Sequence, residues 1–281
     1  MRPSRIVLGG LFGCGLALVV VAALMMIDMR RAPPPDTPTA AAVEAGLGPG
    51  TLLERKRGLL TPATPARYEY APSAEITRAS ARHRTDGLAW RSLLPPGEAP
   101  APVVVLLHGA GRDGLSMLEM WQRVGRTRSV VLIAPEAAGQ TWAAGDLDAG
   151  RIAAMLDAVA GMRAIDRGRV YLFGHSDGAR LAALLLNRGI GPWRAAALHA
   201  GYGPAGRYRR NPSAGPLRLY LGERDHIFSV EGARASAAAL AAAGHDTELH
   251  LIPGHTHWFY EIGPELAADA WRWFEQVDDP S

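Results

Sequence analysis

The sequence predicts an α/β domain in which helices cover both faces of a doubly wound, mostly parallel sheet. Through residues 67–281, short β-branched and apolar runs alternate with alanine- and leucine-rich amphipathic stretches, as the strands and helices of such a domain require. Two of the runs, Val103–Leu107 and Val130–Ala134, are apolar on both faces, which is typical of strands buried between two helical layers. In sheets of this kind, functional groups follow the carboxyl ends of the strands.

The individual elements follow from this alternation. A hairpin turn at Asp86-Gly87 leads into the alternating strand Leu88–Leu94, which Pro95 ends. Further strands are expected at Val103–Leu107, Val130–Ala134, Val170–Phe173, Ala195–Leu198, Leu217–Leu221 and Leu249–Ile252. Helices are expected at Leu147–Met162, Ala179–Asn187, Val230–Ala243 and Glu265–Val277.

The distribution of charge argues against nucleic acid as a partner. Lys and Arg number 30 against 27 Asp and Glu, but residues 1–66 carry seven basic and four acidic side chains, and residues 67–281 carry 23 of each. A neutral domain lacks the basic surface that binds phosphate backbones. The single cysteine, Cys14, lies in the N-terminal apolar run, so residues 67–281 can form neither a disulfide nor a thiolate metal site.

Residues 1–31 are expected to be a signal anchor or a signal peptide. Ile6–Ile27 comprises 22 residues without a charged side chain, and a helix of that length would reach about 33 Å across a hydrocarbon layer of roughly 30 Å. Cleaved signals usually have an apolar region of about 7 to 15 residues, so the length favours an uncleaved anchor. We therefore expect export, with anchoring in a bacterial inner membrane facing the periplasm, or secretion if the segment is cleaved.

The remainder divides into a spacer and a folded domain. Residues 32–66 are rich in proline and alanine and are expected to be a linker. Residues 67–281 are expected to form the α/β domain.

The most informative motif is Gly174-His175-Ser176-Asp177-Gly178, which follows the strand Val170–Phe173 and opens a helix. A serine hydroxyl becomes a nucleophile when it is exposed, close to a base and backed by donors for an oxyanion. A tight strand-to-helix turn supplies these conditions, and the two glycines leave room for it. The alternative is a glycine-rich turn in which Ser176 only caps the helix.

A second loop, His108-Gly109-Ala110-Gly111, also follows an apolar strand. Its glycines let the backbone turn so that the amide of Ala110, with Gly111 as the substitute, could join the amide of Asp177 in an oxyanion hole. His108 could brace the loop by hydrogen bonding.

These features resemble the α/β-hydrolase superfamily, and within it the feruloyl esterases, the polyhydroxybutyrate depolymerases and the phospholipase/carboxylesterase-type hydrolases. The resemblance covers about residues 85–274. It rests on the hairpin and the following strand, on His108-Gly109, on the stretch Asp166–Gly178, on Gly222-Glu223-Arg224-Asp225 and on His255-Thr256-His257. It implies that residues 67–281 are a catalytic domain.

The superfamily order of serine, acid and histidine implies where the partners of Ser176 lie. Asp225 follows the strand Leu217–Leu221 and would orient the histidine. Asp246 precedes the next strand, and Glu261 follows the histidines too closely, so both are less suitable. His257 is favoured as the base because Trp258-Phe259-Tyr260 resembles the pattern after the catalytic histidine of related esterases, and His255 is the reserve.

The sequence thus predicts a serine hydrolase of small-molecule or polymeric esters that needs no cofactor. His255 and His257 could form half of a metal site, but no third ligand is evident and no metal is expected. Trp142 follows a strand carboxyl end and could line the acyl pocket or simply pack under a loop. A peptidase or thioesterase would use the same triad, and a catalytically silent binding module with this fold is the other alternative. The oligomeric state is left open.

Overall fold

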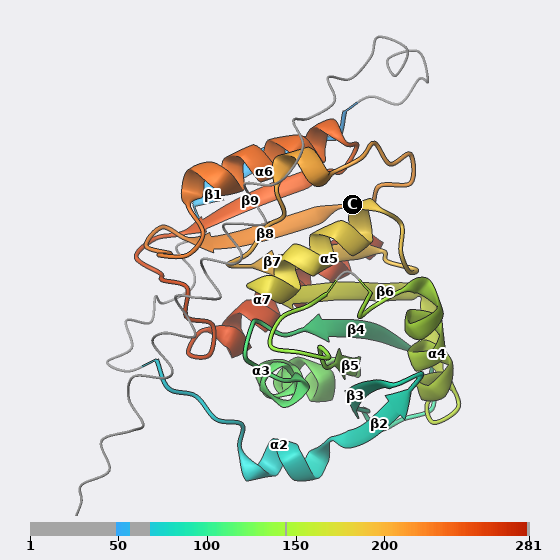
Figure 1. The fold of residues 1–281 in the computed structure, drawn as a ribbon. Coiled ribbons are helices and arrows are strands. Elements are labelled where there is room, and N and C mark those ends of the chain that lie inside the picture. The colour runs from blue at the N-terminus through green and yellow to red at the C-terminus, as the bar shows by residue number, and fades with distance from the viewer. Residues whose placement is uncertain (1–48, 57–67, 144, 280–281) are drawn as a thin grey trace, which may run out of the picture. The chain divides into compact units, whose positions relative to one another are not determined.

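The computed structural model describes residues 49–56, 68–143 and 145–279 of the 281-residue chain (Figure 1). The expected signal or anchor segment, residues 1–31, lies outside the described residues, and so does most of the predicted linker. Within the described part of the chain, no helix is both long enough and apolar enough to cross a membrane.

The described residues form a nine-stranded sheet in the order β1-β9-β8-β7-β6-β4-β5-β3-β2. Its strands are β1 (Leu52–Lys56), β2 (Ala81–Thr85), β3 (Leu88–Leu93), β4 (Ala101–Leu107), β5 (Val131–Pro135), β6 (Ile165–His175), β7 (Ala195–His199), β8 (Leu217–Gly222) and β9 (Thr247–Ile252). From β1 to β5 all neighbours are parallel, and the β2–β3 hairpin adds an antiparallel edge. The predicted mostly parallel sheet is therefore confirmed.

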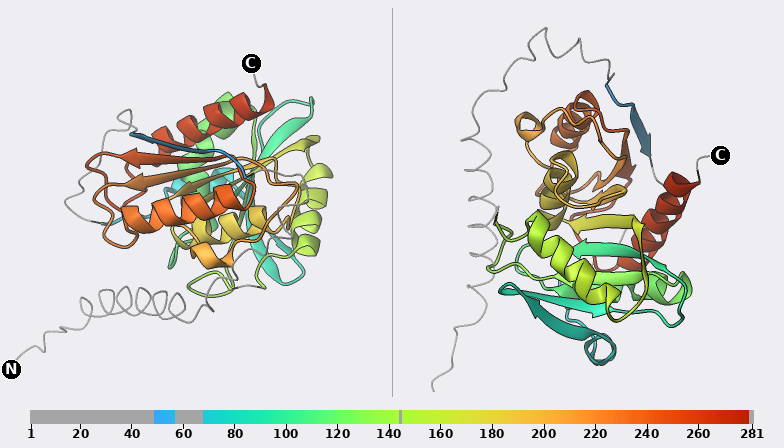
Figure 2. Two further views of the ribbon diagram at one scale, coloured as in Figure 1. Left: turned by 90° about the horizontal axis from the view of Figure 1, so that it is seen from above. Right: turned by 90° about the vertical axis from the view of Figure 1, so that its right-hand side faces the viewer.

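Helices cover both faces of this sheet (Figure 2). They are α2 (Ala74–Ala79), α3 (Gly114–Thr127), α4 (Ala149–Ala160), α5 (Asp177–Asn187), α6 (Val230–Ala242) and α7 (Gly263–Asp278), with a short 3₁₀ turn, η2 (Ala205–Arg207). One buried core joins α4, α5 and α6 to one face, and a second joins α2, α3 and α7 to the other. Alternate residues of β4 enter the two cores, Val103 and Val105 in the first and Val104 and Leu106 in the second, which explains why the strand is apolar throughout.

Local sequence signals account for many of the element boundaries. Asp86 and Gly87 both have positive φ, 47° and 79°, as a two-residue hairpin turn between β2 and β3 requires. Side chains of Asp113, Asp148 and Ser229 accept hydrogen bonds from the first turns of α3, α4 and α6, so each helix begins at a capping residue.

One correction concerns the predicted linker, residues 32–66, because Leu52–Lys56 is strand β1 of the sheet. All five residues are exposed, so no apolar pattern identified them. The strand is held by its parallel pairing with β9 and by polar contacts. Arg234 donates from Nε and Nη2 to the two carboxylate oxygens of Glu54, at 2.9 and 2.7 Å, and Thr51 donates to Asp246.

The structure also contains helix α3, which the sequence analysis did not predict. Two glycines weaken its helical pattern, Gly114 and Gly125. A Cβ at Gly114 would lie 2.7 Å from the carbonyl oxygen of Ala134, and one at Gly125 would lie 3.0 Å from Leu132 Cδ1. Both glycines therefore serve the close packing of α3 on β5, which local helix propensity does not reveal.

Candidate active site

The turn between β6 and α5 holds Ser176 in a strained conformation. Its φ of 54° and ψ of −116° lie in a region that side chains other than glycine rarely adopt. Ser176 is the N-cap residue of α5, but its side chain makes no capping hydrogen bond to the start of the helix. Close backbone packing supports the turn, because a Cβ at Gly174 would lie 2.4 Å from Gly178 O and one at Gly178 would lie 2.2 Å from Leu107 O.

Ser176, His257 and Asp225 form one hydrogen-bonded line. The Ser176 Oγ lies 3.0 Å from His257 Nε2, and His257 Nδ1 lies 2.9 Å from Asp225 Oδ2. These residues follow β6, β9 and β8, whose carboxyl ends meet at one edge of the sheet. The residues predicted from chain order are thus brought together over 81 and 32 positions of sequence.

The surroundings of Asp225 fix the orientation of His257. The Asp225 side chain is fully buried, and its Oδ1 accepts hydrogen bonds from the amides of Ile227 and Phe228 at 2.8 and 2.9 Å. The other oxygen therefore faces His257 and accepts the Nδ1–H. The imidazole lone pair on Nε2 is left facing Ser176, as a base requires.

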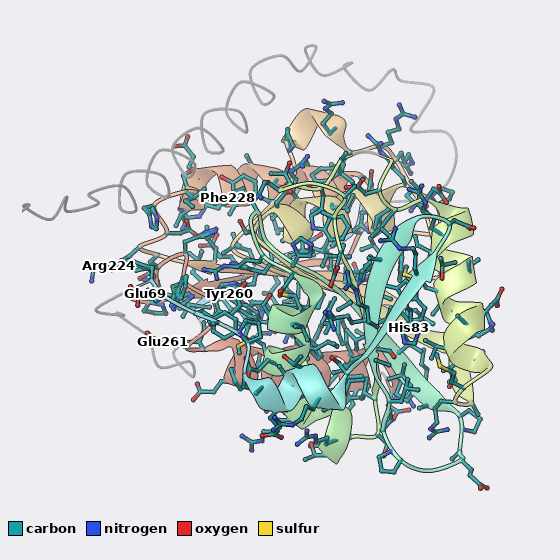
Figure 3. All side chains as sticks on the ribbon, turned by 60° about the horizontal axis from the view of Figure 1, so that its bottom comes forward. Glu69, His83, Arg224, Phe228, Tyr260 and Glu261 are labelled. Carbon is teal, nitrogen blue, oxygen red and sulfur yellow. The ribbon has the colours of Figure 1, made fainter. Side chains whose placement is uncertain are left out.

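Aromatic rings pack around the His257 imidazole. Phe228 lies parallel to it with ring centres 5.9 Å apart, and His226 meets it edge-on at 6.1 Å. Phe228, which is labelled in Figure 3, comes from the loop after β8. These contacts limit the orientations that the His257 ring can adopt beside Ser176.

The alternatives for the acid and the base occupy other positions. His255 is fully buried, and its Nε2 lies 3.1 Å from His199 Nε2 rather than against Ser176. His255 and His257 therefore engage different partners. Asp246 accepts hydrogen bonds from Thr51 beside β1, and Glu261 is exposed.

The loop after β4 is braced by His108, as its sequence suggested. His108 Nε2 accepts a hydrogen bond from Ala137 N at 3.0 Å, so Nδ1 carries the proton and donates to Gly109 O at 2.8 Å. Burial lowers the pKa of His108, which keeps the ring neutral in these roles. The Gly111 amide donates to Gln140 O at 2.7 Å. Gly111 is therefore occupied, and Ala110 remains the loop's candidate oxyanion donor.

The second candidate donor, the Asp177 amide, belongs to the first residue of α5, where N–H groups lack helical partners. The Asp177 carboxylate lies fully buried and makes contacts of its own. One oxygen accepts from Trp142 N at 2.7 Å, and the other accepts from Arg180 Nε at 2.9 Å. Asp177 thereby links the turn between β6 and α5 to the loop after β5 by hydrogen bonds.

Trp142 is placed as a bracing residue. Only 4% of it is exposed, and its indole Nε1–H donates to His108 O at 2.8 Å. Its ring centre lies 4.8 Å from that of His108. Of the two roles that the sequence left open, these contacts favour packing under the loop over lining an acyl pocket, because the polar edge of the ring is already engaged.

Sequence analysis did not single out an aromatic group around Arg112, one residue beyond the loop. The Arg112 guanidinium lies 4.9 Å from the centre of the Tyr260 ring and 5.4 Å from that of Trp258. Arg112 Nη1 donates to Tyr70 O at 3.1 Å, and Tyr70 stacks on Tyr260. Cation–π attraction thus fixes a positive charge beside the candidate oxyanion loop. Its sequence signals are the position of Arg112 directly after Gly111 and the aromatic run Trp258-Phe259-Tyr260.

The chain is similar to known hydrolases in sequence and in fold. The dienelactone hydrolase family model matches residues 117–277, a span that includes Ser176, Asp225 and His257. No curated protein sequence gives a match of comparable significance.

Solved structures of esterases share the fold. An S-formylglutathione hydrolase from Agrobacterium tumefaciens is 16% identical with a TM-score of 0.55, covering 70% of this chain and 94% of its own. An esterase from Thermogutta terrifontis is 16% identical with a TM-score of 0.56, covering 73% and 98%. A ferulic acid esterase is 13% identical with a TM-score of 0.56, covering 70% and 96%. At such identities the similarity establishes the fold, which is the α/β-hydrolase fold expected from the sequence.

Proposed function

The chain belongs to the dienelactone hydrolase family, and from that premise we propose that it hydrolyses carboxylic esters with Ser176 as the nucleophile. The observation that carries the proposal is the line from Ser176 Oγ to His257 Nε2 and from His257 Nδ1 to Asp225, with both distances at or below 3.0 Å. A serine, an imidazole and a buried carboxylate so arranged can activate the hydroxyl.

In the proposed reaction, Ser176 Oγ attacks the ester carbonyl carbon while His257 Nε2 takes its proton. Asp225 stabilises the resulting imidazolium without taking that proton. The amides of Ala110 and Asp177 stabilise the tetrahedral oxyanion, and each such donor typically contributes about 3 to 4 kcal/mol. The intermediate collapses as His257 protonates the departing alcohol. Water, activated by His257, then releases the acid from the acyl-enzyme.

The kinetics of p-nitrophenyl acetate hydrolysis test this mechanism. Ser176→Ala should remove turnover, and Asp225→Asn should lower kcat by roughly 10³- to 10⁴-fold because the imidazole loses its orienting carboxylate. Asp246→Asn is the matched control, because Asp246 contacts Thr51 and not His257. Full activity of Ser176→Ala, or equal losses in the two aspartate variants, would contradict the assignment. A thioester and peptide series run alongside separates an esterase from a thioesterase or peptidase.

We also propose that residues 6–27 anchor the hydrolase in a membrane after export. The supporting observation is the run of 22 residues without charge. Carbonate washing of membranes should leave the full-length protein in the pellet and release a variant lacking residues 2–31. Release of the full-length protein would instead favour a cleaved signal.

A further inference from the structure

Three buried histidines form a chain of rings beside the site. His175 Nδ1 lies 3.0 Å from His199 Nδ1, and His199 Nε2 lies 3.1 Å from His255 Nε2. His175 is 5% exposed, and His199 and His255 are fully buried. The mechanism above uses none of these imidazoles, yet His175 precedes the nucleophile by one residue and His255 precedes the base by two.

The topology explains how residues from three segments meet. His175 and His199 end the neighbouring strands β6 and β7 and pair in register. His255 follows β9, on the far side of β8, so its loop must cross the end of β8 to reach His199. Gly222 permits this crossing, because a Cβ there would lie 2.2 Å from His255 O. The Ser176 amide donates to His199 O at 2.8 Å, so the same strand end also holds the nucleophile's backbone.

The positions of the protons give the hydrogen-bond chain of the three histidines a direction of donation. Each of the two nitrogen–nitrogen bonds needs one proton, and His255 Nδ1 is buried without a hydrogen-bond partner among the described residues. A buried N–H is rarely left without an acceptor, so the proton of His255 belongs on Nε2. His255 then donates to His199 Nε2, and His199 donates from Nδ1 to His175 Nδ1. His175 therefore carries its own proton on Nε2.

The electrostatics of the cluster agree with three neutral rings. Burial lowers the pKa of His175 and His199 well below the ordinary value, and neighbouring imidazoles lower both further. Burial also lowers the pKa of His255 to about 4, although the Asp225 carboxylate opposes this change. Neutral imidazoles can each donate one hydrogen bond and accept another, as a directed chain requires.

Ring packing connects the three histidines to the segments that carry Ser176 and His257. Phe259, two residues after His257, packs on His175 and His199 with ring centres 4.9 and 5.3 Å apart. His175 also lies against the loop after β4, because a Cβ at Gly109 would be 3.0 Å from His175 Cδ2 and 3.3 Å from Ser176 Cβ. The three rings thus contact the segments that carry the nucleophile, the base and the oxyanion loop.

We propose that His175, His199 and His255 are positioning residues, whose directed hydrogen-bond chain holds the His257 loop in register with Ser176. The proposal rests on the proposed esterase function for its kinetic consequence, while the chain itself is a property of the folded protein. Displacing a catalytic group by about 1 Å can lower turnover by roughly 100-fold. Hydrogen bonds that hold the His257 loop in place therefore matter to the reaction.

Nitrogen-15 spectra of the histidine-labelled full-length protein test the direction of the chain. The expected result is protonation at Nε2 in His255, at Nδ1 in His199 and at Nε2 in His175, with assignments made from single His→Phe variants. An Nδ1 proton on His255, or a charged ring among the three at pH 7.5, would overturn the proposal. This measurement does not depend on any enzyme activity.

Kinetics of His199→Phe test the positioning role. Phenylalanine keeps a ring beside Phe259 and leaves the backbone bond to Ser176 in place, but removes both hydrogen bonds. We expect kcat to fall about 10- to 100-fold while KM changes by no more than about twofold. His199→Gln, which can donate and accept, should recover part of the loss. The double variant His199→Phe/His255→Phe should be no slower than His199→Phe, because the chain is already broken.

His83→Phe is the matched control. His83 stacks on Trp90 in the β2–β3 hairpin and bonds to Ser92, and Figure 3 shows it well apart from Tyr260. Its kcat should equal that of the wild type. Unchanged kcat in His199→Phe, or a loss confined to KM, would overturn the positioning role. If the wild type has no esterase activity and Ser176 does not react with a fluorophosphonate, the proposed function fails instead, and the nitrogen-15 result still decides on the chain.

Discussion

The carboxylate of Asp177 accepts a hydrogen bond from the Trp142 amide at 2.7 Å, so the residue after the nucleophile is bonded to the loop after β5. The same carboxylate receives Arg180 at 2.9 Å and is fully buried. A buried charge with two donors is a strong constraint on local geometry.

Replacing Asp177 should therefore destabilise the protein. Asp177→Ala leaves a buried amide and a partly buried guanidinium without their acceptor, and we expect the free energy of unfolding to fall by about 3 to 5 kcal/mol. Urea unfolding measures the change. Asp157→Ala is the control, because its ion pair with Arg167 is exposed and should contribute less than about 1 kcal/mol. Equal effects in the two variants would show that the buried contacts of Asp177 are not stabilising.

A methyl group at Gly222 should disturb the loop after β9, which carries His257. The added Cβ would lie 2.2 Å from His255 O and 2.7 Å from Thr256 O, and backbone atoms cannot move aside cheaply. We expect Gly222→Ala to lower the free energy of unfolding by about 2 kcal/mol or more and to reduce turnover. Gly139→Ala adds the same methyl group where nothing lies within 4 Å and should be neutral. A fully active and stable Gly222→Ala would contradict the described crossing over β8.

Acid should destabilise the protein through its buried neutral histidines. The pKa of His255 is about 4 in the folded state and the pKa values of His175 and His199 are also lowered, so below pH 6.5 the unfolded chain binds more protons than the folded one. The contribution of these histidines to the free energy of unfolding is fully present above about pH 6.5. It falls as the pH falls, by up to ~1.4 kcal/mol per pH unit for each such group. Denaturant unfolding at pH 7, 6 and 5 measures the slope. His255→Phe should have a shallower slope than the wild type by that amount, and identical slopes would exclude a neutral His255.

Strand β1 should stabilise the domain although all its residues are exposed. A chain that starts at residue 67 lacks the partner of β9 and the acceptor for Arg234, whereas a chain that starts at Pro49 retains both. We expect the shorter chain to unfold at a lower denaturant concentration, with a difference of about 1 to 3 kcal/mol from the lost hydrogen bonds. Coincident unfolding curves would show that β1 adds nothing to the sheet.

Much of the sheet was predictable because burial on both faces leaves a clear mark on the sequence. Apolar runs identified two of the strands. Val103–Leu107 lies within β4, and Val130–Ala134 overlaps β5 except at its first residue. Strand β1 carries no such mark, because its five residues are exposed and it is held by backbone pairing with β9 and by Arg234, which lies 180 positions from Glu54. The glycines of α3 were informative only once their contacts with β5 were known.

The candidate site likewise has parts that the sequence predicts and parts that it does not. The serine turn and the positions of Asp225 and His257 could be predicted, because each follows a recognisable strand and the superfamily resemblance supplies their order. The contact between His255 and His199 could not, since it depends on the loop crossing that Gly222 permits. The bracing contacts of Trp142 likewise depend on a loop conformation that its neighbours in sequence do not specify.

The measurement that tests the central claim most directly is the site of reaction with a fluorophosphonate. The full-length protein would be incubated with the probe, digested and mapped by mass spectrometry, with Ser176→Ala and His257→Gln treated in parallel. The proposed mechanism predicts one adduct, on Ser176, with no labelling of Ser176→Ala and slow labelling of His257→Gln. An unlabelled, folded wild-type protein, or an adduct on a different residue, would contradict the assignment of Ser176 as an activated nucleophile.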